Sequence, residues 1–445
     1  MKPDQRATNQ SSLFFSFEDT LHQKHPLYIL ANKVHWHVFE EAFLPLYSQD
    51  KGRPAKPIRL MVGLLILKHI RNISDESVVE QWSENNYYQY FCGETSFVAG
   101  FPCEASELVH FRHRIGEQGI ELILKESIRI NGDDSNDDNV NIDTTVQEKN
   151  ITFPTDAKLH KKIIKKCQKI AQDEQLPVRQ TYTRTLKQLS RDQRFRNHPR
   201  NKSKARKADK KIKTIAGRLV RELERNLPPN SKHQSNLELY KQVLAQKRTT
   251  KNKIYSIHEP EVCCISKGKE HKKYEFGNKA SFVKTDTGVI VGALGFRNEY
   301  DGHTLEPVLE QVERLTNKVP ARAKVDRGYR GKKQVRKTEI LIPSTPKKSM
   351  SYYKRKKLSE AHKKRAAIEP IIGHIKADHR LNRNFYKGIV GDNINIMLAA
   401  AAFNFKRMMN KWKTSFWHFF QTIKNHLENL FYQPIDAKIS NLSSN

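Results

Sequence analysis

The sequence predicts a mixed α/β protein that has a helical N-terminal domain and a basic helical insertion, and three observations support this prediction. Apolar residues recur with helical spacing through the first 130 residues. From residue 140 onward, short β-branched or alternating segments appear, with a helical pattern between them. Early among these segments lies a helical stretch in which Lys and Arg dominate.

The overall charge indicates an anionic partner. The 445 residues include 80 Lys and Arg against 48 Asp and Glu, a formal net charge of +32. A phosphate-rich partner is the simplest reason for such an excess. A polybasic membrane protein is the alternative, but no apolar run approaches the roughly 20 residues that span a bilayer, and the N-terminus lacks the apolar region of a secretory signal. We therefore expect a soluble, cytoplasmic protein.

Residues 1–130 are predicted to be entirely helical. Ser74 and Ser106 can cap two of the helices, and Gly119 is expected to separate the last one. Short helices with short turns fit a helix-turn-helix-like DNA-binding domain that uses Arg71, Arg112, His113 and Arg114. A helical scaffold or dimerisation domain fits equally well. Residues 131–139 are predicted to be an acidic, solvated linker.

Residues 156–255 carry most of the excess charge. They contain 29 Lys and Arg against 8 Asp and Glu, a net of +21 out of the total of +32. Three helices are expected here, interrupted at Pro199 and at Pro228 and Pro229. A charged surface is usually just solvated, but this density favours a contact with a polyanion that neutralises phosphates without reading base sequence.

Three carboxylates stand out in the remaining α/β segment. Asp143 is expected at the end of the strand VNIDTTVQ, and Asp326 follows the short strand in ARAKVDRGYRG. Glu369 lies on a helix, about 20° from Lys376 and beside an apolar face of Ile368, Ile371, Ile372 and Ile375. Two aspartates at strand ends and a helical glutamate are what a two-metal phosphoryl-transfer site requires. Among 48 acids such a triple also arises by chance, so spacing alone leaves the site open.

Several blocks of the chain resemble the DDE transposases of bacterial insertion sequences. VNIDTTVQEKNITFPTDAKL is similar to the first-aspartate block, AKVDRGYRGKK to the second, and HEPEVCCISKGKEHKKYEFGNKASFV and NEYDGHTLEPVL to the segment before it. The third block of the family, Tyr-x2-Arg-x3-Glu-x6-Lys, is matched by Arg365, Glu369 and Lys376, with His362 at the tyrosine position. The helices near residues 53–116 resemble the N-terminal domain of this group.

The resemblance implies a ribonuclease H-like catalytic domain over residues 140–410 and a metal-dependent DNA transposase. Asp143, Asp326 and Glu369 would hold two Mg²⁺ ions, for which Mn²⁺ can substitute. The residues that would contact phosphates are His362, Arg365, Lys376, Arg327 and Arg330. The implied partners are double-stranded DNA, both the terminal inverted repeats of the element and the target, bound by a homodimer or a larger assembly, with the bound protein at the nucleoid.

Two alternatives to a transposase stay open. One is a Mg²⁺-dependent nuclease without strand transfer, and the other is a DNA-binding protein with a decayed active site, against which the presence of all three carboxylates speaks. RNA would also suit the charge, although nothing resembles an RNA-recognition motif. Residues 411–445 form an amphipathic tail, for which packing or self-association is the default expectation.

Overall fold

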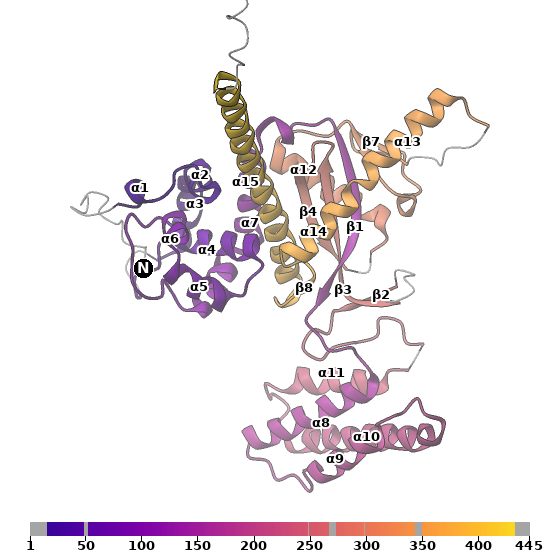
Figure 1. The fold of residues 1–445 in the computed structure, drawn as a ribbon. Helices are drawn as coiled ribbons and strands as arrows, with labels where there is room; N and C mark the ends of the chain where they lie inside the picture. Colours follow the sequence, from indigo (N-terminus) through magenta and orange to yellow (C-terminus); the bar gives the residue numbers. More distant parts are fainter. Residues whose placement is uncertain are drawn as a thin grey trace, which may run out of the picture.

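The computed structural model has an α/β fold in which a helical N-terminal part, a central mixed sheet and an inserted helical module follow one another in space (Figure 1). It describes residues 16–48, 52–247, 249–266, 273–297, 299–342 and 349–431, with the side chains of the last helix described up to Thr414. Within this part of the chain, no helix is both long and apolar enough to cross a bilayer.

Helices make up the N-terminal part, as predicted. They are α1 (Phe17–Thr20), α2 (Pro26–Lys33), α3 (Trp36–Phe43), the 3-10 helix η1 (Leu44–Leu46), α4 (Ile58–Arg71), α5 (Asp75–Glu84), α6 (Asn86–Phe91) and α7 (Ala105–Ile130). Nearly every residue of α4 is buried, so this helix is the centre of the N-terminal core. The predicted cap of α5 is confirmed, because the Ser74 hydroxyl accepts a hydrogen bond of 3.1 Å from the Ser77 N–H.

The predicted boundaries of the last N-terminal helix were wrong. α7 starts at Ala105 and is capped by Glu104, whose side chain and that of Glu107 form a reciprocal capping box. Gly119 lies inside this helix, where an added Cβ would stand 3.0 Å from the Phe43 ring, so the glycine serves close packing. The helix is interrupted instead at Gly116, whose φ of 58° suits glycine.

The central sheet has the strand arrangement of a ribonuclease H-like fold. Its order is β2-β3-β1-β5-β7-β6, with β4 paired to β3 and β8 to β1. β1 runs antiparallel to β3 and parallel to β5, which in turn is parallel to β7. The strands are β1 (Asn139–Lys149), β2 (Cys263–Ser266), β3 (Tyr274–Thr285), β4 (Ile290–Phe296), β5 (Arg322–Lys324), β6 (Gln334–Val335), β7 (Thr338–Leu341) and β8 (Arg383–Asn384).

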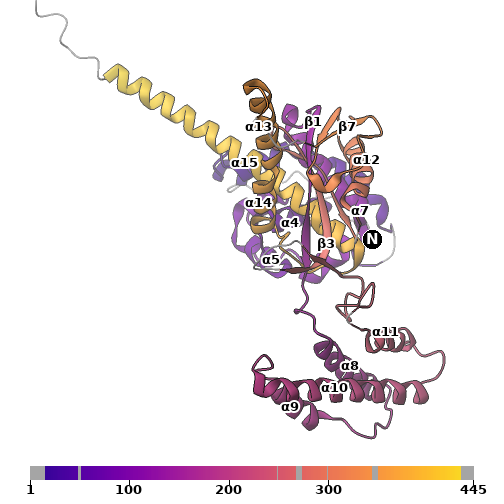
Figure 2. The same ribbon diagram turned by 90° about the vertical axis from the view of Figure 1, so that its right-hand side faces the viewer.

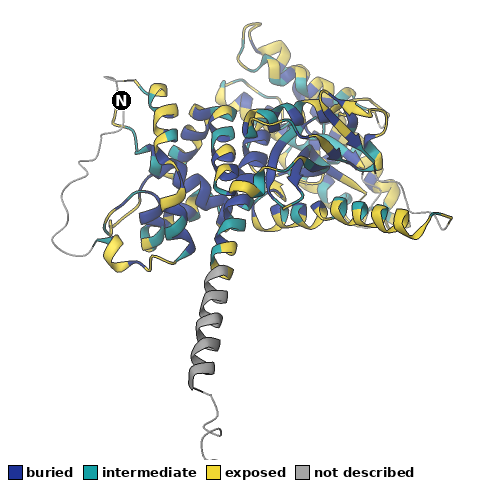
Figure 3. Ribbon diagram, turned by 90° about the horizontal axis from the view of Figure 1, so that it is seen from above, coloured by how far each residue is buried: buried dark blue, intermediate teal, exposed yellow. Residues whose placement is uncertain are grey.

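Four helices accompany the sheet: α12 (Leu305–Thr316), α13 (Tyr352–Ala366), α14 (Ile368–Asp378) and α15 (Gly388–Phe431). α12 packs on β3 and β4, α14 on β1, and α15 on β4 as well as on α4 and α7 of the N-terminal part. One continuous cluster of buried residues therefore joins the N-terminal helices to the sheet (Figure 3). The predicted tail, residues 411–445, begins inside α15, and residues 432–445 lie outside the described residues.

The acidic segment predicted as a linker is docked on the fold. Residues Gly132–Ser135 form the 3-10 helix η2. The Asp134 carboxylate pairs with Arg407 at 2.9 Å and with Lys411 at 3.0 Å, and these hydrogen bonds lower its pKa. Asp137 accepts a hydrogen bond of 2.9 Å from the Asp286 N–H. These contacts hold the start of β1 against α15 and the turn between β3 and β4.

The insertion forms a separate group of helices beyond the far end of β1 (Figures 1 and 2). It comprises α8 (Asp156–Asp173), α9 (Thr183–Asp192), α10 (Pro199–Asn226) and α11 (Gln234–Ala245), of which α9 was not predicted. These helices bury a core of their own, with Ile212, Leu219 and Tyr240 among its residues. Pro199 occupies the first turn of α10, where its missing N–H is not needed.

The two chain segments that lead into and out of the insertion are joined by a buried ion network. Lys149, the last residue of β1, lies 2.5 Å from Asp392 on α15 and 3.6 Å from Glu259, which follows the insertion. The Glu259 carboxylate also accepts a hydrogen bond of 3.2 Å from the Gly388 N–H. Burial raises the pKa of Asp392 to about 6, while the Lys149 ammonium counteracts this rise. The base of the insertion is thereby tied to the sheet and to α15.

Replacing Lys149 with Met should destabilise the fold strongly, because Asp392 would lose its nearest cation at a site where both side chains are 2 % exposed. We expect a loss of about 3–5 kcal/mol in the free energy of unfolding, measured by urea denaturation with tryptophan fluorescence. Lys165→Met, at an exposed position of α8, is the matched control and should change stability by no more than about 0.5 kcal/mol. Equal effects of the two substitutions would contradict the role of the network.

Candidate active site

The register of two parallel strands places Asp143 beside Asp326. Asn139, Val140 and Asn141 of β1 pair with Arg322, Ala323 and Lys324 of β5, a constant offset along the two strands. The same offset, continued two residues further, matches Asp143 with Asp326. Neighbouring strands lie about 4.8 Å apart, and matched residues of a parallel pair face the same side of the sheet. The structure therefore brings these two predicted residues together.

Backbone N–H groups orient both carboxylates. Asp143 accepts a hydrogen bond of 2.8 Å from the Thr144 N–H, and Asp326 accepts one of 2.8 Å from the Gly328 N–H. The prediction that Asp143 ends its strand was wrong. β1 continues to Lys149, and Asp143 pairs with Phe282 of β3 in the middle of the sheet. Asp326 does end its segment: it caps the 3-10 helix η4 (Arg327–Tyr329).

Another carboxylate, that of Asp301, lies near Thr144 and Tyr329, and it was not predicted. Its Oδ1 accepts hydrogen bonds from the Thr144 hydroxyl at 3.2 Å and from the Lys279 ammonium at 2.9 Å. Tyr329 is buried between the aspartates, and burial, together with the charges of Asp301, Asp143 and Asp326, raises its pKa, while Thr144 lowers it. Tyr329 is only 1 % exposed, so it packs inside the fold and does not stack on a base. The signal for Asp301 was its place in NEYDGHTLEPVL, one of the family-like blocks.

Glu369 stands apart from this carboxylate group. It lies in the first turn of α14, where its side chain is 59 % exposed and accepts a hydrogen bond of 3.1 Å from Arg365. The apolar face of α14 is buried as predicted, with Ile368 and Ile375 fully covered, but the edge that carries Glu369 is open to solvent rather than buried. The helical structure is interrupted at Ala367, so that α13 and α14 are separate helices.

α13 carries two of the predicted phosphate ligands and is tied to the sheet next to the aspartates. Asp286 pairs with Lys324 of β5 at 2.9 Å and with Lys364 of α13 at 3.5 Å. Burial raises the pKa of Asp286, but the hydrogen bond from Lys324 and the nearby cations outweigh this, so that the pKa is lowered. His362 and Arg365 on α13 and Lys376 on α14 are half-buried, whereas Arg327 and Arg330 beside Tyr329 are exposed.

The aspartates are suitable ligands for a hard divalent cation, but the structure does not complete a site. Carboxylate oxygens are the donors that Mg²⁺ prefers, and Asp143, Asp326 and Asp301 concentrate negative charge around one buried phenol. In the part of the chain that the structure describes, no three His, Cys, Asp or Glu side chains are grouped closely enough to hold a metal ion. Glu369 would have to exchange its ion pair with Arg365 for the metal.

Comparison with protein families agrees with this geometry. Residues 15–114 match a family described as a transposase domain, and residues 248–405 match the transposase DDE domain. A protein of Rhizobium meliloti described as "Uncharacterized protein ORF8 in nfe locus" is 39 % identical over 196 residues, which cover 43 % of this chain and 94 % of the relative. The chain belongs to the DDE-type transposases of insertion sequences. No solved structure matches this transposase.

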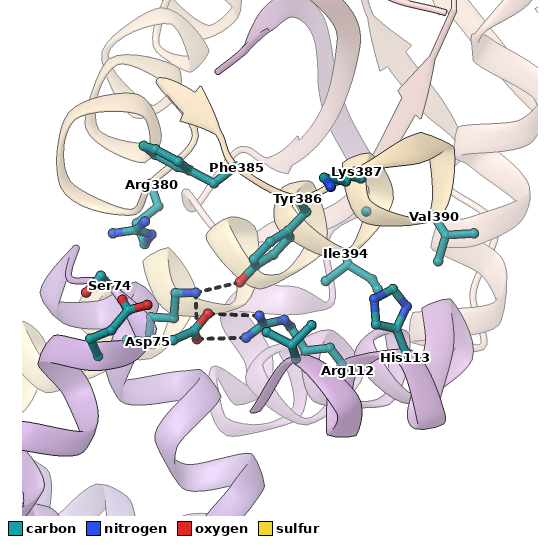
Figure 4. Close-up of a pocket in the computed structure, with 14 residues that line it drawn as sticks. Ser74, Asp75, Arg112, His113, Arg380, Phe385, Tyr386, Lys387, Val390 and Ile394 are labelled. Carbon is teal, nitrogen blue, oxygen red and sulfur yellow. Dashed lines mark hydrogen bonds and ion pairs between the residues drawn. The ribbon is translucent and has the colours of Figure 1, made fainter. Parts of the chain in front are cut away.

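The transposase also has a cavity of about 570 Å³ between the N-terminal helices and the segment after β8 (Figure 4). Asp75 at its wall accepts two hydrogen bonds from Arg112, of 2.7 and 2.8 Å, and one of 2.8 Å from Lys68. Lys68 also donates to the Tyr386 hydroxyl at 2.9 Å. Burial lowers the pKa of Lys68 to about 7, against the opposing effect of Asp75.

This network changes the interpretation of Arg112, one of the side chains considered for contacting DNA bases. Its residue is 5 % exposed, and both of its terminal nitrogens bind Asp75. A guanidinium engaged in this bidentate pair holds α5 to α7 and cannot also bind a base edge. Arg112 is therefore a structural residue.

Asp75→Asn should destabilise the transposase, because Lys68 and Arg112 would remain buried without a counter-charge. We expect a loss of about 3–5 kcal/mol in the free energy of unfolding, measured by chemical denaturation. Glu76→Gln, at the neighbouring exposed position, is the control and should leave stability within about 0.5 kcal/mol of the wild type. A loss below about 1 kcal/mol for Asp75→Asn would contradict this assignment.

Proposed function

We propose that this transposase cleaves DNA at the ends of an insertion sequence and joins the freed ends to target DNA in a metal-dependent reaction. The proposal is supported by the parallel register of β1 and β5, which leads towards Asp143 and Asp326, and by the nearness of both aspartates to the buried Tyr329. Membership of the DDE family supports the same reaction class. The proposed substrates are double-stranded terminal inverted repeats and target DNA, bound at the nucleoid in the cytoplasm.

Asp143, Asp326 and Glu369 are the proposed ligands of two Mg²⁺ ions, for which Mn²⁺ can substitute. When bound, such ions activate the attacking oxygen and neutralise the charge that develops on the phosphate. Thr144 and Gly328 orient the two aspartates through their N–H groups. In the first step water attacks a phosphodiester, leaving a 3′-hydroxyl and a 5′-phosphate. In the second step this 3′-hydroxyl attacks a phosphodiester of the target DNA, which forms a new phosphodiester and releases a 3′-hydroxyl of the target strand.

The proposed roles of the basic residues follow from the geometry of their donors. Arg365 presents a planar fork to a phosphate and Lys376 a single charge, with His362, Arg327 and Arg330 as further phosphate contacts. Arg365 pairs with Glu369 at 3.1 Å. A phosphate bound to Arg365 would take the place of this carboxylate, which would free Glu369 to join the two aspartates.

The proposal includes the domain organisation of the chain. Residues 1–130 form a helical domain, 140–410 the catalytic domain with the insertion at 156–255, and 411–445 the tail. Residues 131–139 connect the first two. A homodimer or larger assembly is proposed, since two element ends must be brought together. One alternative has a specific observation in its favour: the exposed Glu369, paired with Arg365, would also suit a DNA-binding protein with a decayed active site.

Glu369→Gln, Asp143→Asn and Asp326→Asn should each abolish chemistry while preserving DNA binding. The expected loss is at least about 100-fold in nicking and in strand transfer, because each substitution removes a proposed metal ligand. The measurement is a paired-end assay with Mg²⁺ and DNA that carries the native element ends. Glu360→Gln, at an exposed position of α13, is the control and should retain activity.

The same assay separates the alternatives. Cleavage by the wild type without joining would favour a nuclease, and binding without cleavage on the native ends would favour the decayed protein. Full activity of Glu369→Gln would remove this residue from the proposed set, while leaving the aspartates in place.

Asp301→Asn should weaken the response to the metal without abolishing the reaction. Asp301 holds Thr144, the neighbour of Asp143, and Lys279, so its loss would disturb the orientation of Asp143. We expect the affinity for the metal to fall 10–100-fold, visible as a higher half-saturating Mg²⁺ concentration for nicking. Asp138→Asn, at an exposed position, is the control. An unchanged Mg²⁺ titration for Asp301→Asn would show that Asp301 only stabilises the fold.

A further inference from the structure

The inserted module is a structurally separate body with a strongly uneven charge. Its helices α8–α11 enclose their own core, and they stand clear of the N-terminal helices in both views (Figures 1 and 2). Residues 156–255 hold 29 Lys and Arg against 8 Asp and Glu. The module needs few of these cations for its own stability, because its core is apolar.

One side of α10 collects cations around a hollow. This hollow of about 580 Å³ is lined by Lys207, Lys210, Lys211 and Arg218, and by the hydroxyl-bearing side chains of Tyr182 and Thr185. No carboxylate lines it. Across the described residues, no acidic side chain lies within ion-pair distance of these four cations. Ammonium, guanidinium and hydroxyl groups without acids are the set that binds phosphate oxygens.

The spacing of these cations forms a stripe along the helix. At 100° per residue, Lys207, Lys211 and Arg218 fall within about 40° of one another, and all are exposed. At 1.5 Å per residue the stripe is about 16 Å long. Ile212, Ile215 and Leu219 face the core of the module, so the stripe is held outward. An extended row of cations fits the regular phosphates of a duplex better than it fits one small anion.

A second set of three exposed cations lies on another side of α10. Lys202, Arg206 and Lys213 lie about 140° around the helix from the stripe and are also exposed. Asp209 lies on this side, where it pairs with Arg196 at 2.6 Å. None of these three cations lines the hollow, so the two sets carry equal charge and differ only in position.

The position of the module relative to the aspartates is fixed by the buried network at its base. Lys149 joins Asp392 and Glu259 at the end of β1, six residues after Asp143. Six residues of a strand span about 20 Å. Successive phosphates of one DNA strand advance about 3.4 Å along the duplex. The end of β1, from which the chain enters the module, thus lies about 20 Å, or about six base pairs, from Asp143.

We propose that the stripe on α10 binds the phosphate backbone of double-stranded DNA, six or more base pairs from the bond that is cleaved, without reading its sequence. The distance to the cleaved bond rests on the proposed function, which places the reaction at Asp143. The contact with DNA rests on the stripe alone. Its ligand is the duplex backbone, because lysine and arginine contacts to phosphates carry no base information.

The test uses the full chain with the triple variant K207Q/K211Q/R218Q and the matched variant K202Q/R206Q/K213Q. The affinity for a 40-base-pair duplex of unrelated sequence is measured at several salt concentrations. Loss of three phosphate contacts should make the slope of log K against log [salt] shallower by about 2.7, so that the fall in affinity between 50 and 200 mM salt becomes about 40-fold smaller. The matched variant should keep most of the slope of the wild type.

Several outcomes would overturn the proposal. Equal slopes for the two triple variants would mean that only total charge matters. A loss of affinity for RNA or for anionic lipid vesicles, but not for duplex DNA, would assign the stripe to another partner. If the triple variant does not fold, as judged by circular dichroism, the single variant K211Q must still lower the slope by about 0.9. These binding measurements hold even if the protein cleaves no DNA.

The predicted distance is tested separately by nicking. On a native end whose phosphates more than five base pairs from the cleaved bond are replaced by neutral methylphosphonates, the K207Q/K211Q/R218Q variant should nick as fast as the wild type. On the same end with all of its phosphates, it should nick more slowly than the wild type at 200 mM salt. A defect on both substrates would refute the distance but not the contact, and absence of nicking by the wild type would refute the proposed function instead.

Discussion

The pairing of β1 with its two neighbours is the constraint on which the rest of the structure depends. Against β5 it runs in parallel, and this register sets Asp143 beside Asp326. Against β3 it runs antiparallel over nine residue pairs, from Val140 to Glu148. A shift of one residue would turn every side chain of β1 to the opposite face of the sheet. The position of Asp143, the hydrogen bond from Thr144 to Asp301 and the direction in which the insertion leaves the sheet all follow from this one strand.

Ion pairs connect both ends of β1 to α15. At its start, Asp134 is bound by Arg407 and Lys411 of α15, and at its end Lys149 is bound by Asp392 of the same helix. Since α15 also packs on α4 and α7, it joins the N-terminal helices to the sheet in one continuous core. Of these pairs, Lys149 and Asp392 are buried, and buried charges are costly unless they are paired.

Charge is divided between two tasks in different parts of the chain. In the N-terminal part and around β1, buried cations such as Lys68, Arg112 and Lys149 are each matched by a carboxylate and contribute to the fold. On α10, exposed cations such as Lys207 and Arg218 line a hollow to which the described residues contribute no carboxylate. The excess positive charge of the whole chain is therefore a surface property of the insertion more than of the core. This division is consistent with a DNA-binding protein whose catalytic centre is itself acidic.

The sequence by itself determined the type of most elements and the family. Helical spacing was sufficient for α4, α8, α10 and α14, and alternation was sufficient for β1, because local periodicity reflects local burial. Composition located the basic insertion, and the blocks around Asp143, Asp326 and Glu369 indicated a transposase, which the family comparison confirmed. The unpredicted α9 has only two apolar side chains, Leu186 and Leu189, of which Leu189 is buried, so its apolar face is too short to stand out in a polar segment.

Only the tertiary structure decided which side chains meet. It placed Asp301 beside Thr144 and Lys279, which are 157 and 22 residues away in sequence, and no local pattern encodes such contacts. It also showed that Arg112, a candidate DNA contact, is a buried partner of Asp75. Glu369 lies exposed beside Arg365. The physical reason is the same in each case: periodicity predicts whether a residue faces the core, whereas its partner depends on how distant elements pack.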